Sequence, residues 1–168
     1  MKIDSRVIPT NQLWYYVTDD AILDNISLYQ KPFDTQVVKH EKQINKCIIT
    51  CVDDIRVINE VWYGGKDYIT NIVIPDSVTE IGNYAMYECD SLTSVTIGKS
   101  VTYIGSHAFF YCRNLKDVYC KPIIPPEFGA NVFGNNGKNR KIYVPRNSVE
   151  SYKKEWNKYA SDIEPYDF

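Results

Sequence analysis

Two stretches of 17 residues in this chain are similar to each other, and the second begins 23 residues after the first. The first copy, "IGNYAMYECDSLTSVTI", runs from Ile81 to Ile97, and the second, "IGSHAFFYCRNLKDVYC", runs from Ile104 to Cys120. The positions that agree are apolar, small or glycine, whereas the residues between them differ freely. A period that preserves only inward-type residues is typical of a solenoid, because each repeat can bury its apolar side only against its neighbours.

The period continues more weakly on both sides of the two regular copies. Matching apolar residues lie 23 residues upstream and 24 residues downstream, and they include Ile55, Ile58, Ile142 and Val144. We therefore predict about four rungs of roughly 23 residues, two of them regular and one degenerate at each end. Mutual burial requires at least about three such units.

Each rung divides into three parts. The segments "LTSVTI" (92–97) and "LKDVYC" (115–120) predict strands that stack into a parallel sheet. Alternation within the first strand directs Val95 and Ile97 inward and Ser94 and Thr96 outward. "SVTEIG" and "SVTYIG" predict a second short extended piece, and "NYAMYEC" and "SHAFFYC" predict about one helical turn between the two pieces.

The segments outside the repeat are expected to cover the ends of the solenoid, because open sheet edges would recruit other strands. We predict an N-terminal β-cap over residues 1–46, rungs over 47–122, and a last degenerate rung with a C-terminal helical cap over 123–168. All three belong to one structural domain. Within the first segment, "LWYYVT" and "DTQVVKHE" predict strands.

The C-terminal cap is predicted as one helix, "VPRNSVESYKKEWNKYASDI", followed by "IEPYDF", which closes the end. Asn147 and Glu150 suggest an asparagine version of the capping box. One helical face carries apolar residues that should lie over the last rung. These residues are Val149, Tyr152, Trp156 and Tyr159.

Charge and hydropathy exclude some classes of partner. The 19 basic residues against 21 acidic ones leave a net charge of −2 and no basic stripe, which argues against nucleic acid. No apolar run approaches the ~20 residues that would span a bilayer, so membrane insertion is not expected. The N-terminal sequence lacks the ~7–15-residue apolar stretch of a secretory signal. We expect a chain that is not exported by that route, or one that begins at an added Met.

The cysteines and histidines do not form a recognisable chemical motif. Five cysteines with irregular spacing do not predict a disulfide framework. Cys89 and Cys112 are one repeat apart, so we favour small buried thiols over a redox couple or half of a metal site. His107 and Cys112 could form a pair of base and nucleophile, but a histidine at the surface is the favoured interpretation. We predict a non-enzymatic protein without metal or cofactor.

The outward face of the predicted strands is the better candidate for function. Tyr and Arg are enriched where proteins bind one another, and both gather in the last two rungs. The alternative is an ordinary solvent-facing strand surface, where Thr and Tyr are favoured anyway. The predicted ligand-binding residues are Asn71, Val73, Ser94, Thr96, Lys116, Asp117, Tyr119, Arg140, Lys141 and Tyr143.

Aromatic residues also gather on the opposite, convex side of the predicted solenoid. Tyr87, Phe110 and Tyr111 could form an interface between copies of the chain, or they could pack locally on Tyr84. The sequence leaves these alternatives open.

Three segments resemble the BspA-type leucine-rich repeat proteins of anaerobic gut and oral bacteria. They are "IPDSVTEIGNYAMYECDSLTSVTI", "VYCKPIIPPEFGANVF" and "KIYVPRNSVESYKKEWNKYASDIEPYDF", and "NQLWYYVTDD" is similar to their entry segment. The resemblance covers residues 11–168. It implies a short, capped leucine-rich repeat solenoid of the α/β, β-rich class. It also implies display at the cell surface or secretion, with adhesion to host proteins or other cells.

Two functions therefore remain open. The first is an interaction module that recognises a protein, such as a host or cell-surface protein, through the outward face of the strand sheet. The second is a structural or intracellular protein-binding unit without an adhesive role, which could self-associate weakly.

Overall fold

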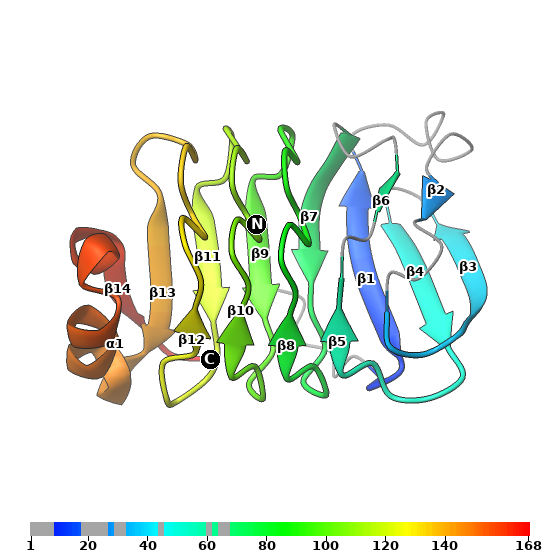
Figure 1. The fold of residues 1–168 in the computed structure, drawn as a ribbon, viewed down its shortest axis with the longest axis horizontal. Coiled ribbons are helices and arrows are strands. Elements are labelled where there is room, and N and C mark those ends of the chain that lie inside the picture. Colours follow the sequence, from blue (N-terminus) through cyan, green and yellow to red (C-terminus); the bar gives the residue numbers. More distant parts are fainter. Residues whose placement is uncertain (1–8, 18–26, 29–32, 44–45, 60–61, 64–67) are drawn as a thin grey trace.

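The computed structural model describes residues 9–17, 27–28, 33–43, 46–59, 62–63 and 68–168. Successive rungs stack along the long axis of the molecule (Figure 1). Their strands lie side by side in parallel as β7 (Ile69–Val73), β9 (Ser94–Ile97), β11 (Asp117–Cys120) and β13 (Lys141–Pro145). The molecule is therefore rich in strands that are mostly parallel, as an α/β, β-rich solenoid requires.

The 23-residue spacing sets the register of these strands. Asn71 pairs with Ser94, Ser94 with Asp117, and Asp117 with Lys141. The next outward positions follow the same rule, since Val73 pairs with Thr96, which is followed by Tyr119 and Tyr143. Both predicted outward columns thus run straight across the sheet.

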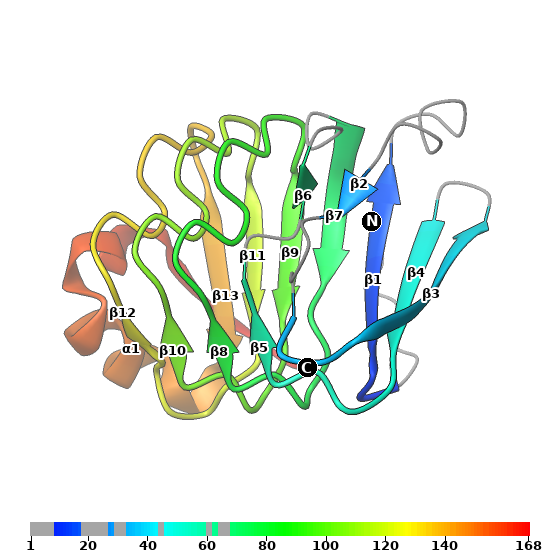
Figure 2. The same ribbon diagram turned by 45° about the vertical axis from the view of Figure 1, so that its right-hand side comes forward.

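A second, smaller parallel sheet faces the first (Figure 2). Its order is β12 (Glu127–Phe128), β10 (Tyr103–Ile104), β8 (Glu80–Ile81) and β5 (Val57–Ile58). The core lies between the two sheets, and equivalent residues of neighbouring rungs fill it. Val78 with Val101, and Leu92 with Leu115, are almost completely buried in this one cluster.

The segments predicted as helical turns adopt a different conformation. Residues 83–88 and 106–111 form consecutive turns, and Tyr84, Glu88, His107 and Tyr111 have φ between 55° and 61°. The backbone N–H of Tyr84 donates to the carbonyl of Ser106, at 3.0 Å, in the next rung. Because alternate N–H groups bond across rungs, the continuous series of bonds along the chain that a helix needs cannot form.

The N-terminal strands of the main sheet are antiparallel. β1 (Gln12–Val17) lies between β7 and β4 (Lys46–Cys51) in the sheet. β3 (Val37–Gln43) pairs with the other side of β4 and forms the edge of the sheet. The first strand of the segment predicted as rungs thus differs from the later ones, because β4 pairs with β1 in the antiparallel direction. β1 takes the place beside β7 since its Leu13 and Tyr15 are completely buried in the core. Two further short strands, β2 (Ser27–Leu28) and β6 (Trp62–Tyr63), pair separately.

The C-terminal segment is divided into short helices. η3 (Arg146–Ser148), α1 (Val149–Glu155) and η4 (Asn157–Asp162) precede β14 (Ile163–Tyr166), which joins the sheet parallel to β13. Ser148 occupies the N-cap of α1 without a side-chain bond, so the predicted capping box does not form. The predicted apolar face is present, because Tyr152, Trp156 and Tyr159 are buried against the last rung.

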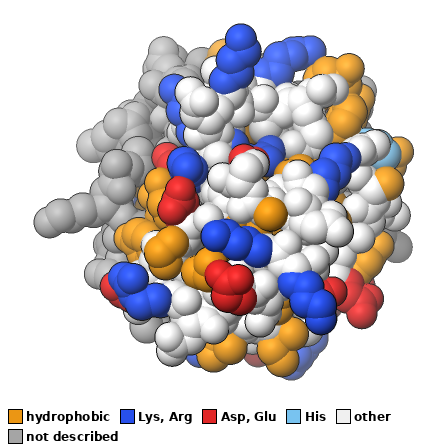
Figure 3. Space-filling model, turned by 90° about the vertical axis from the view of Figure 1, so that its left-hand side faces the viewer, with side chains coloured by type: hydrophobic (Ala, Val, Ile, Leu, Met, Phe, Trp, Pro, Cys, Tyr) orange, Lys and Arg blue, Asp and Glu red, His pale blue; other side chains and the backbone are white. Residues whose placement is uncertain are grey.

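The outer side of this end is polar. Figure 3 shows Lys, Arg, Asp and Glu side chains interspersed over the C-terminal end of the molecule, with smaller apolar areas between them. A polar outer face is what a terminal unit of a solenoid needs in water. None of the helices in the described part of the chain has the length and apolar character that a membrane crossing requires.

Candidate interaction surface

Four aromatic residues form a cluster on the outward face of the main sheet, in its C-terminal half. The rings of Tyr119 and Tyr143 stack with centroids 4.9 Å apart, and Tyr166 meets them edge-on at 5.4 and 5.6 Å. Phe168 lies 5.0 Å from Tyr166 and is half exposed. We call Tyr119, Tyr143, Tyr166 and Phe168 the tyrosine cluster.

The fold brings these residues together from three strands. Tyr119 and Tyr143 occupy the same register position in β11 and β13. β14 continues the parallel arrangement and places Tyr166 beside Pro145, at the end of β13. Tyr166 and Phe168 were not among the predicted ligand-binding residues, because "IEPYDF" does not follow the repeat spacing. The alternation of Ile163 inward and Glu164 outward is the signal that would have suggested a further strand.

The surroundings of both stacked tyrosines disfavour ionisation of their hydroxyls. Burial raises the pKa of Tyr119 to about 12, and the nearby Asp117 carboxylate adds to the effect. Burial also raises the pKa of Tyr143, and its hydroxyl donates a hydrogen bond to Asp117. At neutral pH the cluster therefore offers ring edges and protonated hydroxyls, which suit contacts with both apolar and polar groups of a partner.

Two ion pairs border the tyrosine cluster. The Lys141 ammonium lies 2.7 Å from a Glu164 carboxylate oxygen, and this hydrogen bond raises the pKa of Lys141 and lowers that of Glu164. Arg146 donates two hydrogen bonds to Asp167, at 3.1 and 2.8 Å. Of the predicted charged residues, Lys141 is thus engaged at the border of the cluster, whereas Lys116 is exposed beside it.

The N-terminal half of the outward face is covered. Val73 is 9% exposed and packs with Trp14 and Ile48, which β1 and β4 bring over it. Asn71 and Thr96 are each 6% exposed. The amide of Asn71 donates to the Ser94 hydroxyl. The interpretation of Asn71, Val73 and Thr96 as exposed contact residues is therefore wrong, because neighbouring strands supply large side chains that the repeat does not predict.

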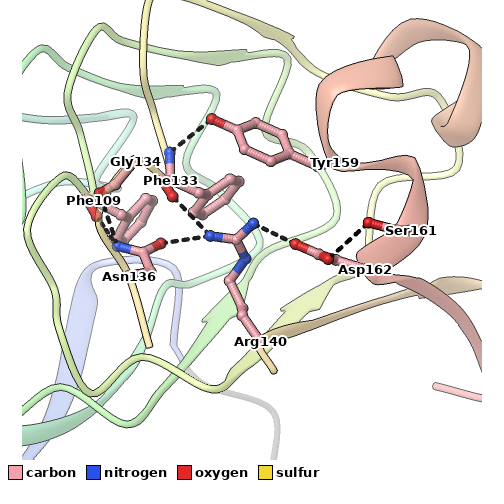
Figure 4. Close-up of polar contacts among 8 residues, drawn as sticks. All are labelled: Phe109, Phe133, Gly134, Asn136, Arg140, Tyr159, Ser161 and Asp162. Carbon is pink, nitrogen blue, oxygen red and sulfur yellow. Dashed lines mark hydrogen bonds and ion pairs between the residues drawn. The ribbon is translucent and has the colours of Figure 1, made fainter. Parts of the chain in front are cut away.

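Arg140 belongs to the interior rather than to the outward face. Its guanidinium donates to the carbonyl of Phe133 at 2.7 Å and to the Asn136 side chain at 3.0 Å, and it pairs with Asp162 at 2.5 Å (Figure 4). The residue is 8% exposed. Its placement beside the tyrosines was wrong, because it ties the last rung to η4.

A second aromatic group lies along the turns on the other side of the solenoid. Tyr84 stacks on His107 with centroids 5.2 Å apart, and Tyr87 stacks on Phe110 at 6.2 Å. Tyr111 contacts Phe110 edge-on at 4.5 Å. These residues pack on one another, as one of the two open alternatives expected, while Tyr84 remains 46% exposed.

The cysteines are placed for packing. All five are buried and unbridged. The thiol of Cys112 donates to the carbonyl of Met86 at 3.1 Å, and burial raises the pKa of Cys120 to about 12. A raised pKa disfavours the thiolate that nucleophilic or redox chemistry requires. Within the described residues, no three His, Cys, Asp or Glu side chains are grouped as metal ligands.

Stacked parallel strands with buried L-x-x-L-x-L positions define a leucine-rich repeat solenoid. A family model described as a BspA-type leucine-rich repeat region matches residues 39–164 in six copies. The chain belongs to this family, which confirms the resemblance and indicates a protein-interaction module of a generally non-enzymatic kind. The six copies exceed the four rungs predicted from the spacing, and the match begins within β3. A comparison with curated proteins finds no match.

Proposed function

We propose that this chain is a non-enzymatic recognition module that binds a protein partner through the tyrosine cluster. The observation that carries the proposal is the stacking of partly exposed Tyr119 and Tyr143, supported by Tyr166. Tyrosine supplies a large contact area with few rotatable bonds, and it is frequent among the residues that dominate binding energy. Because the rings already hold one another, little side-chain freedom remains to be lost on binding.

The size of the surface limits the affinity of a single contact. The cluster extends across three strands, and neighbouring strands lie ~4.8 Å apart. The patch is therefore narrower than a standard protein–protein interface. Lys116, Asp117, Ser94 and Lys141 extend it along the sheet. Tight binding to a large partner would then need several copies of the module side by side.

We also propose that the module consists of four rungs closed at both ends. β1, β4 and β3 form the N-terminal cap, and the α1 segment with β14 forms the C-terminal one. The supporting observations are the buried Leu13 and Tyr15 at one end and Tyr152 and Trp156 at the other. The boundary of the N-terminal cap then falls after β4, a few residues beyond the predicted position at 46.

Adhesion is the biological role that we propose for this recognition, at the cell surface or after secretion. It rests on the family and on the aromatic patch together. The partner class is a host or cell-surface protein, and neither a membrane nor a nucleic acid is required.

The test is a comparison of partner capture by matched variants. The wild-type protein, the double variant Tyr119→Ala/Tyr143→Ala and the control Tyr84→Ala are immobilised and exposed to extracts of cell-surface proteins. We expect proteins that are retained by the wild type and the control but lost with the double variant. Equal retention by all three proteins would show that the tyrosine cluster is not the binding site.

A second candidate is an assembly unit that self-associates weakly through the turn-side aromatics. The exposed ring of Tyr84 is the observation that favours it. Sedimentation velocity over a range of concentrations tests it. A concentration-dependent dimer that disappears in Tyr84→Ala supports assembly, and a strict monomer contradicts it.

A further inference from the structure

Three side-chain carboxylates around the tyrosine cluster have partners within the described part of the chain. Asp117 accepts a hydrogen bond from the Tyr143 hydroxyl. Glu164 pairs with Lys141, and Asp167 pairs with Arg146. A cationic group of a partner would therefore have to displace an existing hydrogen bond or ion pair before it could gain one here.

Two lysines flank β11, the strand that carries Tyr119. Lys116 precedes β11 and is exposed, and Lys121 follows β11 and is partly exposed. Within the described part of the chain, neither lysine forms an ion pair. Two cations without an ion pair among the described residues thus lie at the two ends of the strand that carries Tyr119.

The register places Lys121 close to the aromatic residues. Tyr119 pairs with Tyr143, so that Lys121, two residues further along, falls at the level of Pro145. Pro145 in turn pairs with Tyr166 of β14. Lys116 and Lys121 are five residues apart, which in an extended chain is about 16 Å.

We propose that the tyrosine cluster binds an extended acidic segment of a partner protein, with carboxylates at Lys116 and Lys121 and an apolar side chain between them. The inference rests on the proposed function and names the chemistry of the partner. The stacked faces of Tyr119 and Tyr143 contact each other, so the ring edges remain for the apolar side chain and the Tyr119 hydroxyl remains for a main-chain carbonyl. Charge complementarity then selects acidic over basic segments.

The experiment uses three synthetic peptides with blocked ends. The first is Glu-Ser-Leu-Leu-Ser-Glu, whose two Glu residues are five positions apart in sequence, as the two lysines are, and the others replace both Glu residues by Gln or by Lys. Binding to the isotope-labelled full chain is followed by NMR. We expect the acidic peptide to shift the resonances of Tyr119, Tyr143 and Tyr166 and to bind more weakly as salt is added.

Variants of the protein distinguish recognition by these two lysines from attraction of the peptide by the net charge of the protein. Lys116→Gln/Lys121→Gln is expected to weaken binding of the acidic peptide about fivefold, as for two exposed charge pairs. The control Lys39→Gln/Lys154→Gln removes the same charge from exposed lysines on β3 and α1 and is expected to leave the affinity unchanged. Equal weakening by both double variants would overturn the proposal, because it would show a response to net charge alone.

The peptide series also distinguishes this inference from the proposed function. If the Lys peptide binds as tightly as the acidic one, or if the acidic peptide shifts no resonance of the cluster, acidic recognition is wrong. If the Gln peptide binds equally well and Tyr143→Ala abolishes that binding, the charge inference fails while the tyrosine cluster stands as a protein-binding site. Failure of the capture experiment, in contrast, would overturn the proposed function itself.

Discussion

The two halves of the outward sheet face occupy equivalent strand positions but have opposite properties. In the N-terminal half, Val73 lies beneath Trp14 and Ile48 and is 9% exposed. In the C-terminal half, Tyr119 and Tyr143 occupy the same column and remain partly exposed. The repeat specifies which way a side chain points, but the neighbouring strands decide whether it is covered.

The difference arises from the strands that complete the sheet at its two ends. β1 and β4 are antiparallel and bring large apolar side chains across the outward face. β14 is parallel and brings Glu164 and Tyr166, which leave the neighbouring rings accessible. One half of the face therefore contributes to stability, and the other is available for recognition. Four experiments with matched variants can test this division, beginning with the largest expected effect.

Trp14→Ala should be the most destabilising of these changes. The ring is 7% exposed, so its removal leaves a cavity above Val73 and should lower the free energy of unfolding by about 3 kcal/mol. Urea denaturation measures the effect. Phe168→Ala, in the exposed half, is the control and should change stability by less than about 0.5 kcal/mol. Similar losses for both variants would contradict the division of the face.

Arg140→Leu and Lys141→Leu compare adjacent cations of which only the first is buried. Arg140→Leu leaves the Phe133 carbonyl without its donor and Asp162 without its partner, which should cost about 2 kcal/mol. Lys141→Leu removes an ion pair at the surface and should have a clearly smaller effect. Thermal unfolding of both variants measures the difference, and an equal loss would mean that Arg140 is not a structural tie.

Val73→Ala and Tyr143→Ala should separate stability from binding. Val73→Ala should lower the free energy of unfolding by about 1.5 kcal/mol and leave the affinity of the folded protein for a captured partner unchanged. Tyr143→Ala should reduce that affinity by about tenfold or more. Affinities are measured well below the melting temperature of each variant. A Val73→Ala protein that is folded but does not bind would extend the binding site into the covered half.

The smallest effect is expected at alkaline pH. The pKa of Tyr119 is about 12 in the folded protein and about 10 in an unfolded chain. Between these values the unfolded state releases the proton more readily, so stability falls as pH rises from about 10 to about 12. Tyr119→Phe should reduce this loss, measured by urea denaturation at several pH values. An unchanged loss would mean that Tyr119 is not the group responsible.

Several features of the fold could be predicted because they depend only on neighbouring rungs. Apolar residues spaced by 23 or 24 residues predicted the parallel register of β7, β9, β11 and β13. The helical spacing of Tyr152, Trp156 and Tyr159 predicted the face that covers the last rung. The two stacked tyrosines followed from the same spacing.

Other features could not be read from the period. The turn segments resemble helical ones in composition, but alternate N–H groups, including those of Tyr84 and His107, bond to the next rung, and both residues adopt positive φ. The sequence predicted Arg140 as a cation on the outward face, whereas its guanidinium is buried and bonds to three polar partners. Tyr166 entered the candidate surface only through the pairing of β14 with β13.

The sequence by itself determined the stacked interior of this protein, because rung packing is a nearest-neighbour rule that recurs along the chain and leaves a periodic trace. Only the tertiary structure decided which outward residues are covered and which are accessible. That choice depends on β1, β4 and β14, whose pairings do not follow the register of 23 or 24 residues that joins β7, β9, β11 and β13. Contacts outside that register leave no regular spacing in the sequence from which they could be predicted.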